Sequence, residues 1–223
     1  MSKNDGPSTP GGEAKLSRAS VQRFSLYLRH LERWNQEGLT VVSSSQLGEV
    51  LGINDAQVRK DLAYLGNLGQ PGIGYQTQEL IGALRQRLGV DRAWSAIVIG
   101  AGNLARALLR YHGFAQQGFQ FVGLFDADPA KIGQEVEGLT VRAPDQLAEV
   151  IAKTGAALAV VAVPADTAQQ VADALVAAGI KGILNFAPVM LKLPPHVSLI
   201  AVDLAVQLEQ LAFLVHVAKH DAV

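Results

Sequence analysis

The sequence predicts an α/β protein in two parts, with a group of short N-terminal helices preceding a doubly wound parallel sheet. Over residues 16–66, apolar residues recur at helical spacing. From residue 93 to residue 203, short apolar strands alternate with helices, which is typical of a parallel sheet with right-handed crossovers. The expected segments are a disordered tail (1–15), a helical domain (16–78), a linker helix (79–92), the sheet domain (93–203) and a C-terminal helix (204–223).

The composition is that of a soluble globular protein, because 49% of the 223 residues are hydrophobic and 17% are charged. The first residues are polar, rich in Gly and Pro, and lack an apolar centre, which favours a disordered tail in a cytoplasmic protein over a signal peptide. No apolar run is long enough to span a membrane. The absence of cysteine excludes disulfides, zinc–thiolate sites and thiol redox switches. A redox sensor made from this chain would need a bound cofactor.

The charge balance alone gives little support for nucleic-acid binding. The net charge is −1, and residues 1–78 carry eight basic against seven acidic side chains. Nucleic-acid binders usually show a strongly basic face. Any case for DNA must therefore rest on the residue pattern of the N-terminal part.

Residues 16–66 predict three helices, of which the last two follow the helix-turn-helix plan. The apolar face of the first helix is expected at Phe24, Leu28 and Leu31. Either Ser44 or Ser45 can cap the short second helix. The apolar face of that helix is expected at Leu47, Val50 and Leu51.

The third helix follows a tight turn and is capped by Asn54 or Asp55. Its core-facing positions are Val58, Leu62 and Leu65, and its other positions hold Gln57, Arg59, Lys60 and Tyr64. Gln and Arg read base edges, and Lys neutralises phosphate. An ordinary solvated helix face is the alternative interpretation.

The glycine-rich stretch NLGQPGIGY after the third helix suits a hairpin wing. A capped helix, a turn, a polar third helix and such a wing together favour a winged-helix DNA-binding domain over residues 16–78. The expected DNA contacts are Ser44, Ser45, Gln57, Arg59, Lys60, Tyr64, Gly72 and Gly74.

The C-terminal part has five apolar strands, WSAIVIG, FQFVGLFD, ALAVVAVP, GIKGILNF and VSLIAVD, with helices between them. The first strand runs into the GxGxxA pattern Gly100-Ala101-Gly102-Asn103-Leu104-Ala105. In such a loop the first Gly permits a tight turn, and the second lets the backbone approach a pyrophosphate at the start of the next helix. Ala105 takes the place of the third Gly, at the contact between helix and strand.

Asp126 makes the dinucleotide interpretation specific, because it ends the second strand about twenty residues further on. A carboxylate there accepts hydrogen bonds from the adenine ribose hydroxyls. It also repels a 2′-phosphate, which favours NAD(H) over NADP(H). Lys131 either neutralises phosphate or stays solvated.

The nicotinamide is expected over the carboxyl ends of the other strands, at Val163-Pro164 and near Asn185. Asn185 can hydrogen-bond a carboxamide, or it can satisfy its own backbone. The expected cofactor-binding set comprises Gly100, Ala101, Gly102, Asn103, Leu104, Ala105, Tyr111, Asp126, Lys131, Val163, Pro164 and Asn185.

Residues for catalysis are not recognisable in the sequence. None of the five histidines stands in a motif with a partner acid, the Tyr-x-x-x-Lys motif of short-chain dehydrogenases is absent, and no metal-ligand cluster is found. The chain is therefore expected not to be an enzyme and to hold no metal. A small NAD-dependent oxidoreductase and a CoA- or nucleotide-binding module are the alternatives.

The last twenty residues form one apolar helical stripe at Leu204, Leu208, Leu211 and Leu214-Val215. A stripe of this kind must pack on something. Packing on its own domain is one possibility, and packing on a second subunit is the interpretation that we favour.

The chain resembles the Rex family of bacterial redox-sensing transcriptional repressors. The resemblance is carried by YLRHLE, SSSQLGEVLGIN, AQVRKDL, GIGY, GAGNLARALLRYHGF, FDADPAKIG, VPADTAQ, AAGIKGILNFAP and VDLAVQLE, in order from about Leu16 to the final helix. It implies a winged-helix domain joined to a Rossmann-like domain, in a homodimer with exchanged C-terminal helices. It also implies binding to an inverted-repeat operator on double-stranded DNA when NADH is scarce, release when NADH rises, and competition by NAD+ for the same site.

Carried over by the resemblance, Arg59 and Lys60 fall in the recognition helix with Gln57 and Tyr64 beside them, Gly100–Ala105 match the nucleotide loop, and Asp126 matches the ribose acid. Arg29, Tyr111 and Asp203 match a polar set near the domain interface, with Leu204 next to it.

Two positions depart from the family pattern. Gln70-Pro71 stands where the wing usually carries a basic residue, which puts minor-groove contacts in doubt, and Ala105 replaces the more usual Gly.

Two hypotheses concern the switch. The oxidised nicotinamide ring is cationic, so an apolar pocket lined by Tyr111 and Leu204 would disfavour NAD+ relative to NADH. Asp203 is expected to hydrogen-bond Tyr111 in one state and to pair with Arg29 in the other.

Overall fold

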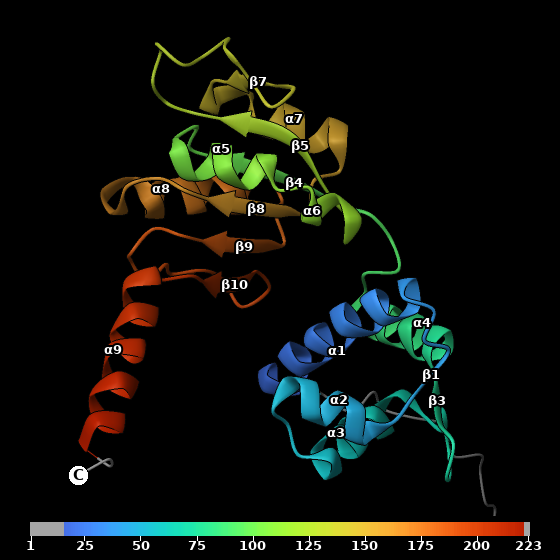
Figure 1. Cartoon of the computed structure of the whole chain (residues 1–223). Helices are drawn as coiled ribbons and strands as arrows, with labels where there is room; N and C mark the ends of the chain where they lie inside the picture. Colours follow the sequence, from blue (N-terminus) through green and yellow to red (C-terminus); the bar gives the residue numbers. More distant parts are fainter. Residues whose placement is uncertain (1–15, 221–223) are drawn as a thin grey trace, which may run out of the picture. The chain divides into compact units, whose positions relative to one another are not determined.

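The computed structural model describes residues 16–220 and divides into two compact units, which meet in the sequence between Arg92 and Ala93 (Figure 1). The expected tail over 1–15 and the last three residues of the expected C-terminal helix lie outside the described residues. In the described part of the chain, no helix is both long enough and apolar enough to cross a membrane.

The first unit has four α-helices within its described residues, α1 (Arg18–Gln36), α2 (Ser44–Leu51), α3 (Asp55–Leu62) and α4 (Thr77–Leu88). A 3-10 helix (Ala63–Leu65) extends α3. The small antiparallel sheet has the order β1-β3-β2, formed by β1 (Val41–Val42), β3 (Gly74–Gln76) and β2 (Gly69–Gln70). Helix-turn-helix and hairpin thus follow in the expected order.

The core of this unit explains why α1 is helical where the spacing predicted it. Phe24, Leu28 and Leu31 are buried, and they pack with Val58 and Leu62 of α3 and with Leu80 and Leu84 of α4. Deep burial of one apolar stripe stabilises a helix more than its intrinsic propensity does.

The start of α2 differs from the expectation, because the cap is Ser43 and neither Ser44 nor Ser45. Ser43 and Gln46 form a capping box, in which the Ser43 hydroxyl accepts from the Gln46 N–H and the Gln46 amide oxygen accepts from the Ser43 N–H. The helix therefore begins one residue earlier. Val50 does not belong to the buried face, since 47% of it is exposed.

The second unit is built on a seven-stranded sheet in the order β10-β9-β8-β4-β5-β7-β6, in which only β6 is antiparallel to its neighbour. The five predicted strands are β4 (Trp94–Ile99), β5 (Phe119–Phe125), β8 (Leu158–Val161), β9 (Gly182–Asn185) and β10 (Ser198–Ala201). The pair β6 (Glu135–Val136) and β7 (Leu139–Arg142) was not foreseen. The chain reverses its direction of travel across the sheet at β4, which places a topological switch point there.

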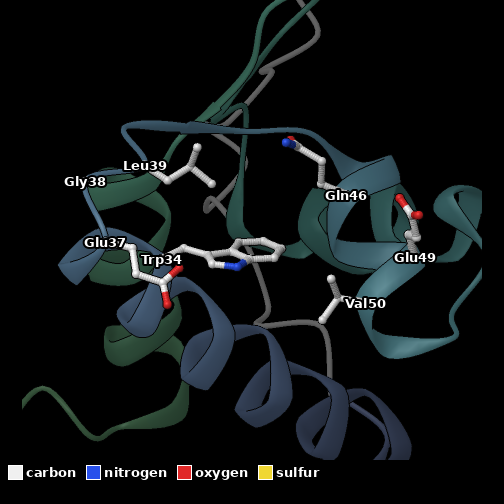
Figure 2. A pocket seen from close by; sticks show the side chains of 7 residues that line it. All are labelled: Trp34, Glu37, Gly38, Leu39, Gln46, Glu49 and Val50. Atoms are coloured by element: carbon white, nitrogen blue, oxygen red, sulfur yellow. The ribbon is translucent and has the colours of Figure 1, made fainter.

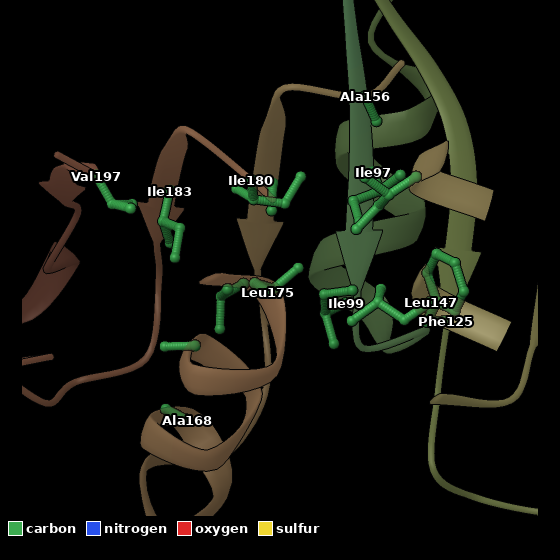
Figure 3. Packing of buried hydrophobic residues seen from close by; sticks show 14 of the residues in the cluster. Ile97, Ile99, Phe125, Leu147, Ala156, Ala168, Leu175, Ile180, Ile183 and Val197 are labelled. Carbon is green, nitrogen blue, oxygen red and sulfur yellow. The ribbon is translucent and has the colours of Figure 1, made fainter. Parts of the chain in front are cut away.

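Alternate residues of the central strands feed two cores on opposite faces of the sheet. Ile97 and Ile99 of β4 pack on one face with Phe125, Leu147 and Leu175 (Figure 3). This face is covered by α7 (Leu147–Thr154) and α8 (Ala165–Ala177). Val98 points to the other face, where it packs with Ala105 of α5 (Asn103–Arg110). The short helix α6 (Gly113–Gln116) follows α5.

The chain ends in α9 (Leu204–His220), whose large apolar side chains are exposed. Leu208, Leu211 and Leu214 are 66%, 56% and 63% exposed. The apolar stripe predicted from the sequence therefore has no apolar cover within the part of the chain that the structure describes.

Candidate functional site

The loop after β4 has the backbone geometry that a dinucleotide requires. Gly100 adopts a φ of +98°, and a Cβ there would collide with the carbonyl oxygen of Ala162, so only glycine fits. At Gly102 a Cβ would meet no protein atom within 4 Å. The protein's own packing thus does not demand glycine at 102, whereas a molecule lying against the backbone would. Both roles predicted for these glycines are consistent with the geometry.

Asp126, at the end of β5, is held beside this loop by three donors. Its Oδ2 accepts from the backbone N–H of Ala101 at 2.7 Å and from Lys131 Nζ at 2.9 Å, and its Oδ1 accepts from the N–H of Asp128 at 2.9 Å. Burial alone would raise the pKa of Asp126, but the two backbone N–H groups and the Lys131 ammonium outweigh it and hold the pKa below its usual value. Asp126 is therefore an ionised acceptor at neutral pH.

A cleft of about 530 Å³ opens in front of Asp126, at the carboxyl ends of β4, β5 and β8. Its lining includes six predicted residues, namely Gly100, Gly102, Asp126, Lys131, Val163 and Pro164. Sequence reasoning missed its apolar wall, formed mainly by Pro144, Leu147, Val171 and Ala174, and the polar Thr167 and Gln170. Pro144 and Leu147 follow β7, so recognising that short strand would have pointed to them.

The remaining predicted cofactor residues lie outside the lining of this cleft. Ala101 donates its N–H to Asp126. Asn103 and Leu104 begin α5, and Ala105 lies on the fully buried face of the same helix. Tyr111 follows α5, is 58% exposed and packs edge-to-face on Phe114 at 5.2 Å between ring centroids.

For Asn185 the structure favours the backbone alternative. Its side-chain Nδ2 donates to the carbonyl oxygens of Ala187 and Val189, each at 3.0 Å, and its Oδ1 accepts from the Ala187 N–H at 3.0 Å. Both amide hydrogens are thus used within the chain. Asn185 shapes the loop after β9 through these bonds, and its contact with the nicotinamide stays a prediction.

In the first unit, α3 presents the basic residues expected for DNA recognition. Arg59 is half-exposed, forms an ion pair with Asp55 at 2.6 Å and donates to the Ser44 hydroxyl at 3.3 Å. Lys60 and Ser45 are exposed, and Tyr64 is 44% exposed on the 3-10 helix. Ser44 is buried, so it supports Arg59 from within and does not face outward.

A buried polar network beneath α3 was missed by the sequence reasoning. Asp61 is 1% exposed and accepts from Arg23, Tyr27 and Gln57. A signal was present, because Asp61 is three residues after Val58 and four before Leu65 and so borders the apolar face of the helix. A charge on an apolar face indicates a buried partner.

The wing is the hairpin between β2 and β3. Its tip is a turn in which the N–H of Ile73 donates to the carbonyl oxygen of Gln70 at 3.1 Å, with Pro71 and Gly72 (φ +77°) as the central residues. A Cβ on Gly74 would lie 2.5 Å from the carbonyl oxygen of Val42, so Gly74 is required by packing. Gln70, Pro71 and Ile73 are exposed.

The polar set implied by the resemblance is divided between the units. Arg29 is exposed on α1 of the first unit, and Tyr111 and Asp203 belong to the second. Asp203 Oδ1 accepts from the N–H groups of Ala205 and Val206 at 2.9 and 3.2 Å, so it caps the start of α9.

A second cavity, of about 430 Å³, lies in the first unit beside Trp34 (Figure 2). Glu37 and Glu49 also line it, which makes it unsuited to phosphate. Within the described residues, no group of three or more His, Asp or Glu side chains could hold a metal ion.

Comparison with known proteins divides the chain in a similar way. The family model described as "CoA binding domain" matches residues 91–189, and the model described as "Putative DNA-binding protein N-terminus" matches residues 15–63. These matches correspond to the sheet unit and to the helical unit.

Relatives that match most of the chain are also found. A protein of Pelotomaculum thermopropionicum named redox-sensing transcriptional repressor Rex is 46% identical over 199 residues, which cover 89% of this chain and 93% of that protein. Crystal structures of RSP, a Rex-family repressor, are similar as well. RSP in complex with β-NAD+ and operator DNA matches with a TM-score of 0.87 and 34% identity, over 94% of this chain and 96% of RSP. RSP with β-NADH matches with a TM-score of 0.83 and 33% identity, over 94% and 98%.

Proposed function

This chain belongs to the Rex family of redox-sensing transcriptional repressors, and we propose that it binds an inverted-repeat operator when NADH is scarce and leaves it when NADH rises. It is a DNA-binding repressor, not an enzyme, and NAD(H) is the ligand that it senses. The observation on this chain that best supports the role is the open approach to Gly102 beside the ionised Asp126.

The cleft suggests how the dinucleotide lies. An adenine ribose hydroxyl donates to Oδ1 of Asp126, which has one donor from the chain, and the adenine ring rests against the apolar wall at Pro144, Leu147 and Val171. The pyrophosphate lies against Gly102 at the start of α5, where free N–H groups and the helix dipole favour an anion. The nicotinamide then reaches Val163-Pro164 at the carboxyl ends of the strands.

Discrimination between NADH and NAD+ must come from the nicotinamide ring, because the rest of the dinucleotide is the same in both. The oxidised ring is cationic, and an apolar surround such as Tyr111 and Leu204 would disfavour it by desolvation. To move the protein from 1:99 to 99:1 between two states, NADH must prefer one state by about 10⁴-fold, or ~5.5 kcal/mol. Arg29, Tyr111 and Asp203 are the proposed coupling residues. Asp203 would give up its hydrogen bonds to the first N–H groups of α9 and bind Tyr111 in one state and Arg29 in the other.

DNA binding is assigned to α3 and the wing. Gln57, Arg59, Lys60 and Tyr64 face the major groove, Ser45 and the wing lie near the backbone, and Ser44 acts through Arg59. Two recognition helices one helical turn apart read an inverted repeat, which requires a homodimer. The exposed apolar stripe of α9 is the proposed dimer contact. The protein would act in the cytoplasm, where a bacterial operator lies.

Fluorescence anisotropy tests the proposal directly. A labelled inverted-repeat duplex is bound by the full chain at fixed salt, and NADH, NAD+ and CoA are then titrated separately. NADH should release the DNA at concentrations where NAD+ and CoA do not. CoA is included because the matching model for residues 91–189 carries its name. Equal release by NADH and NAD+ would overturn the redox-sensing role, and release by CoA alone would assign the cleft to another ligand.

A further inference from the structure

The buried carboxylate of Asp61 is not used by the function proposed above. It lies on the recognition helix α3, is 1% exposed, and stands between the core residues Val58 and Leu62. A buried charge costs stability unless it is paired and its lone pairs are satisfied. The stability of the buried Asp61 carboxylate therefore depends on the groups that surround it.

Asp61 is fully satisfied by four hydrogen bonds from three side chains. Its Oδ2 accepts from Arg23 Nε at 2.5 Å and from the Tyr27 hydroxyl at 2.9 Å. Its Oδ1 accepts from Arg23 Nη2 at 2.7 Å and from Gln57 Nε2 at 2.9 Å. Each carboxylate oxygen thus has two donors, which is about its capacity. The bidentate guanidinium of Arg23 supplies the compensating charge.

The charge state of Asp61 decides which end of the Gln57 amide faces it. Burial would raise the pKa of Asp61, but the hydrogen bonds from Arg23, Tyr27 and Gln57 outweigh it and hold the pKa below its usual value. An ionised carboxylate has no hydrogen to donate, so only the amide nitrogen of Gln57 can face it. The two ends of a glutamine amide are normally interchangeable, and here the exchange is blocked.

This orientation leaves Gln57 with a defined set of groups for DNA. One Nε2 hydrogen of Gln57 is donated to Asp61, and the second Nε2 hydrogen stays available to DNA. The Oε1 atom is also available, because no donor among the described residues bonds to it. In the major groove, adenine offers an N7 acceptor beside an N6 donor, which matches this pair. Guanine offers two acceptors, O6 and N7, and thymine offers an acceptor, O4, so both would face Oε1 with like polarity.

We propose that Asp61 is a positioning residue that locks the Gln57 amide so that Gln57 reads an adenine in the operator. The inference rests on the proposed DNA-binding role of α3. It adds a specificity determinant that does not itself touch DNA, because Asp61 acts only through the orientation of Gln57.

Tyr27 provides a matched control within the same network. Its hydroxyl donates to Oδ2 of Asp61, whereas Gln57 donates to Oδ1. Tyr27→Phe therefore removes one bond from the buried carboxylate and leaves the bond to Gln57. If the network served stability alone, Tyr27→Phe and a change at Asp61 would affect the preference for adenine in the same way and would differ only in the size of the effect.

The experiment begins by selecting duplexes from a randomised double-stranded DNA pool with the full chain and NAD+. Single base-pair changes in the selected duplex, measured with wild type and Gln57→Ala, then locate the position at which Gln57 discriminates. We expect that position to be an adenine, with a preference over guanine of about 5- to 100-fold. In Asp61→Asn, the amide of the new side chain can face Oε1 of Gln57 and turn it inward. The adenine preference should then fall to the level of Gln57→Ala, while Tyr27→Phe keeps it.

A double-mutant comparison completes the test. In the Gln57→Ala background, Asp61→Asn should cause no further change in discrimination at that position. The inference is overturned if Gln57 discriminates at a guanine or a thymine. This outcome needs only wild type and Gln57→Ala, so it can be observed even if Asp61→Asn does not fold. An equal loss of affinity on every duplex in Asp61→Asn would also overturn it, since that marks a structural role. Failure to select any duplex would overturn the DNA-binding role itself.

Discussion

The ammonium of Lys131 lies 2.9 Å from Oδ2 of Asp126, so the acid expected to read the adenine ribose carries its own counter-charge. The Asp126 side chain is 12% exposed and that of Lys131 is 36% exposed, which leaves the pair open to the cleft. The exclusion of a 2′-phosphate therefore depends on the balance of these two charges. Changing either residue should alter cofactor selectivity.

Asp126→Ser is expected to weaken NADH binding by about 10- to 100-fold, the range for loss of a hydrogen bond to a charged group. The same change leaves Lys131 without its carboxylate partner, so NADPH should bind more tightly than it does to wild type. Isothermal titration with both nucleotides measures the two effects. Asp126→Ser combined with Lys131→Gln is the control and should lose the gain for NADPH. Unchanged NADPH binding in the single variant would contradict the role of Lys131.

The two glycines of the loop should respond in opposite ways to alanine. Gly100→Ala places a Cβ against the Ala162 carbonyl at a φ of +98°, so the free energy of unfolding should fall by at least about 1–2 kcal/mol. Gly102→Ala meets no protein atom within 4 Å, so stability should change by less than about 0.5 kcal/mol while NADH binding is lost. Thermal melting and titration of both variants check this, and a Gly102→Ala variant that binds NADH normally would place the pyrophosphate elsewhere.

These glycines also show which parts of the site could be predicted. A tight turn after a buried strand needs glycine for backbone reasons alone, and a carboxylate at the end of the next strand follows from spacing, so the sequence could place Gly100, Gly102 and Asp126 around one cleft, while their contacts with a nucleotide stay a prediction. The apolar wall was not found, because β6 and β7 have only two and four residues. Strands of that length leave no period in the sequence to recognise.

Local competition explains the other differences. Three serines in a row offer three possible caps for α2, and only the position of Gln46 selects Ser43 through the capping box. Asp61 borders the apolar face of α3, but its partner Arg23 lies 38 residues away in the sequence. Such a pairing is decided by tertiary packing, which no local pattern contains.

Acid should destabilise the first unit through Asp61. Because its pKa is lowered on folding, its contribution is complete above the ordinary aspartate value of 3.8 and is lost as the pH falls through the lower folded value. Tyr27→Phe removes one donor from Asp61, so the free energy of unfolding should fall by about 0.5–1.5 kcal/mol at neutral pH. The acid-induced loss of stability should also begin at a higher pH than in wild type.

Urea denaturation between pH 7 and pH 3 measures the free energy of unfolding of wild type and of Tyr27→Phe as a function of pH. The chain has two tryptophans, so in a Trp94→Phe background only Trp34 reports, and it belongs to the first unit. Wild type and Tyr27→Phe curves that stay parallel as the pH falls would show that Asp61 is not the titrating group.

The wing should gain affinity from a positive charge at its tip. Gln70 is exposed and contributes its carbonyl oxygen to the turn, so Gln70→Arg keeps Pro71 and Gly72 in place. If the wing lies near the DNA backbone or minor groove, the dissociation constant should fall and the slope of log K against log salt should steepen by about one. Gln70→Glu should have the opposite effect. Identical slopes for both variants would mean that the wing does not approach DNA.

The exposed stripe on α9 should determine the oligomeric state. Burying a leucine side chain at an interface contributes about 1.5–3 kcal/mol, and a glutamate there would add an unpaired charge. Leu208→Glu together with Leu211→Glu should therefore give a monomer by size-exclusion chromatography with light scattering. Gln210→Glu adds a charge to the same helix away from Leu208 and Leu211 on the helix wheel, so this control should remain dimeric.

The same pair of variants separates dimerisation from ligand binding. The cleft in front of Asp126 takes no part of its lining from α9, so the adenine end of NADH should still bind to the monomer. Affinity for the inverted repeat should fall strongly, because one recognition helix can contact only one half-site at a time. A leucine-to-glutamate variant that stays dimeric would show that the subunits meet through another surface and that the apolar stripe serves a different contact.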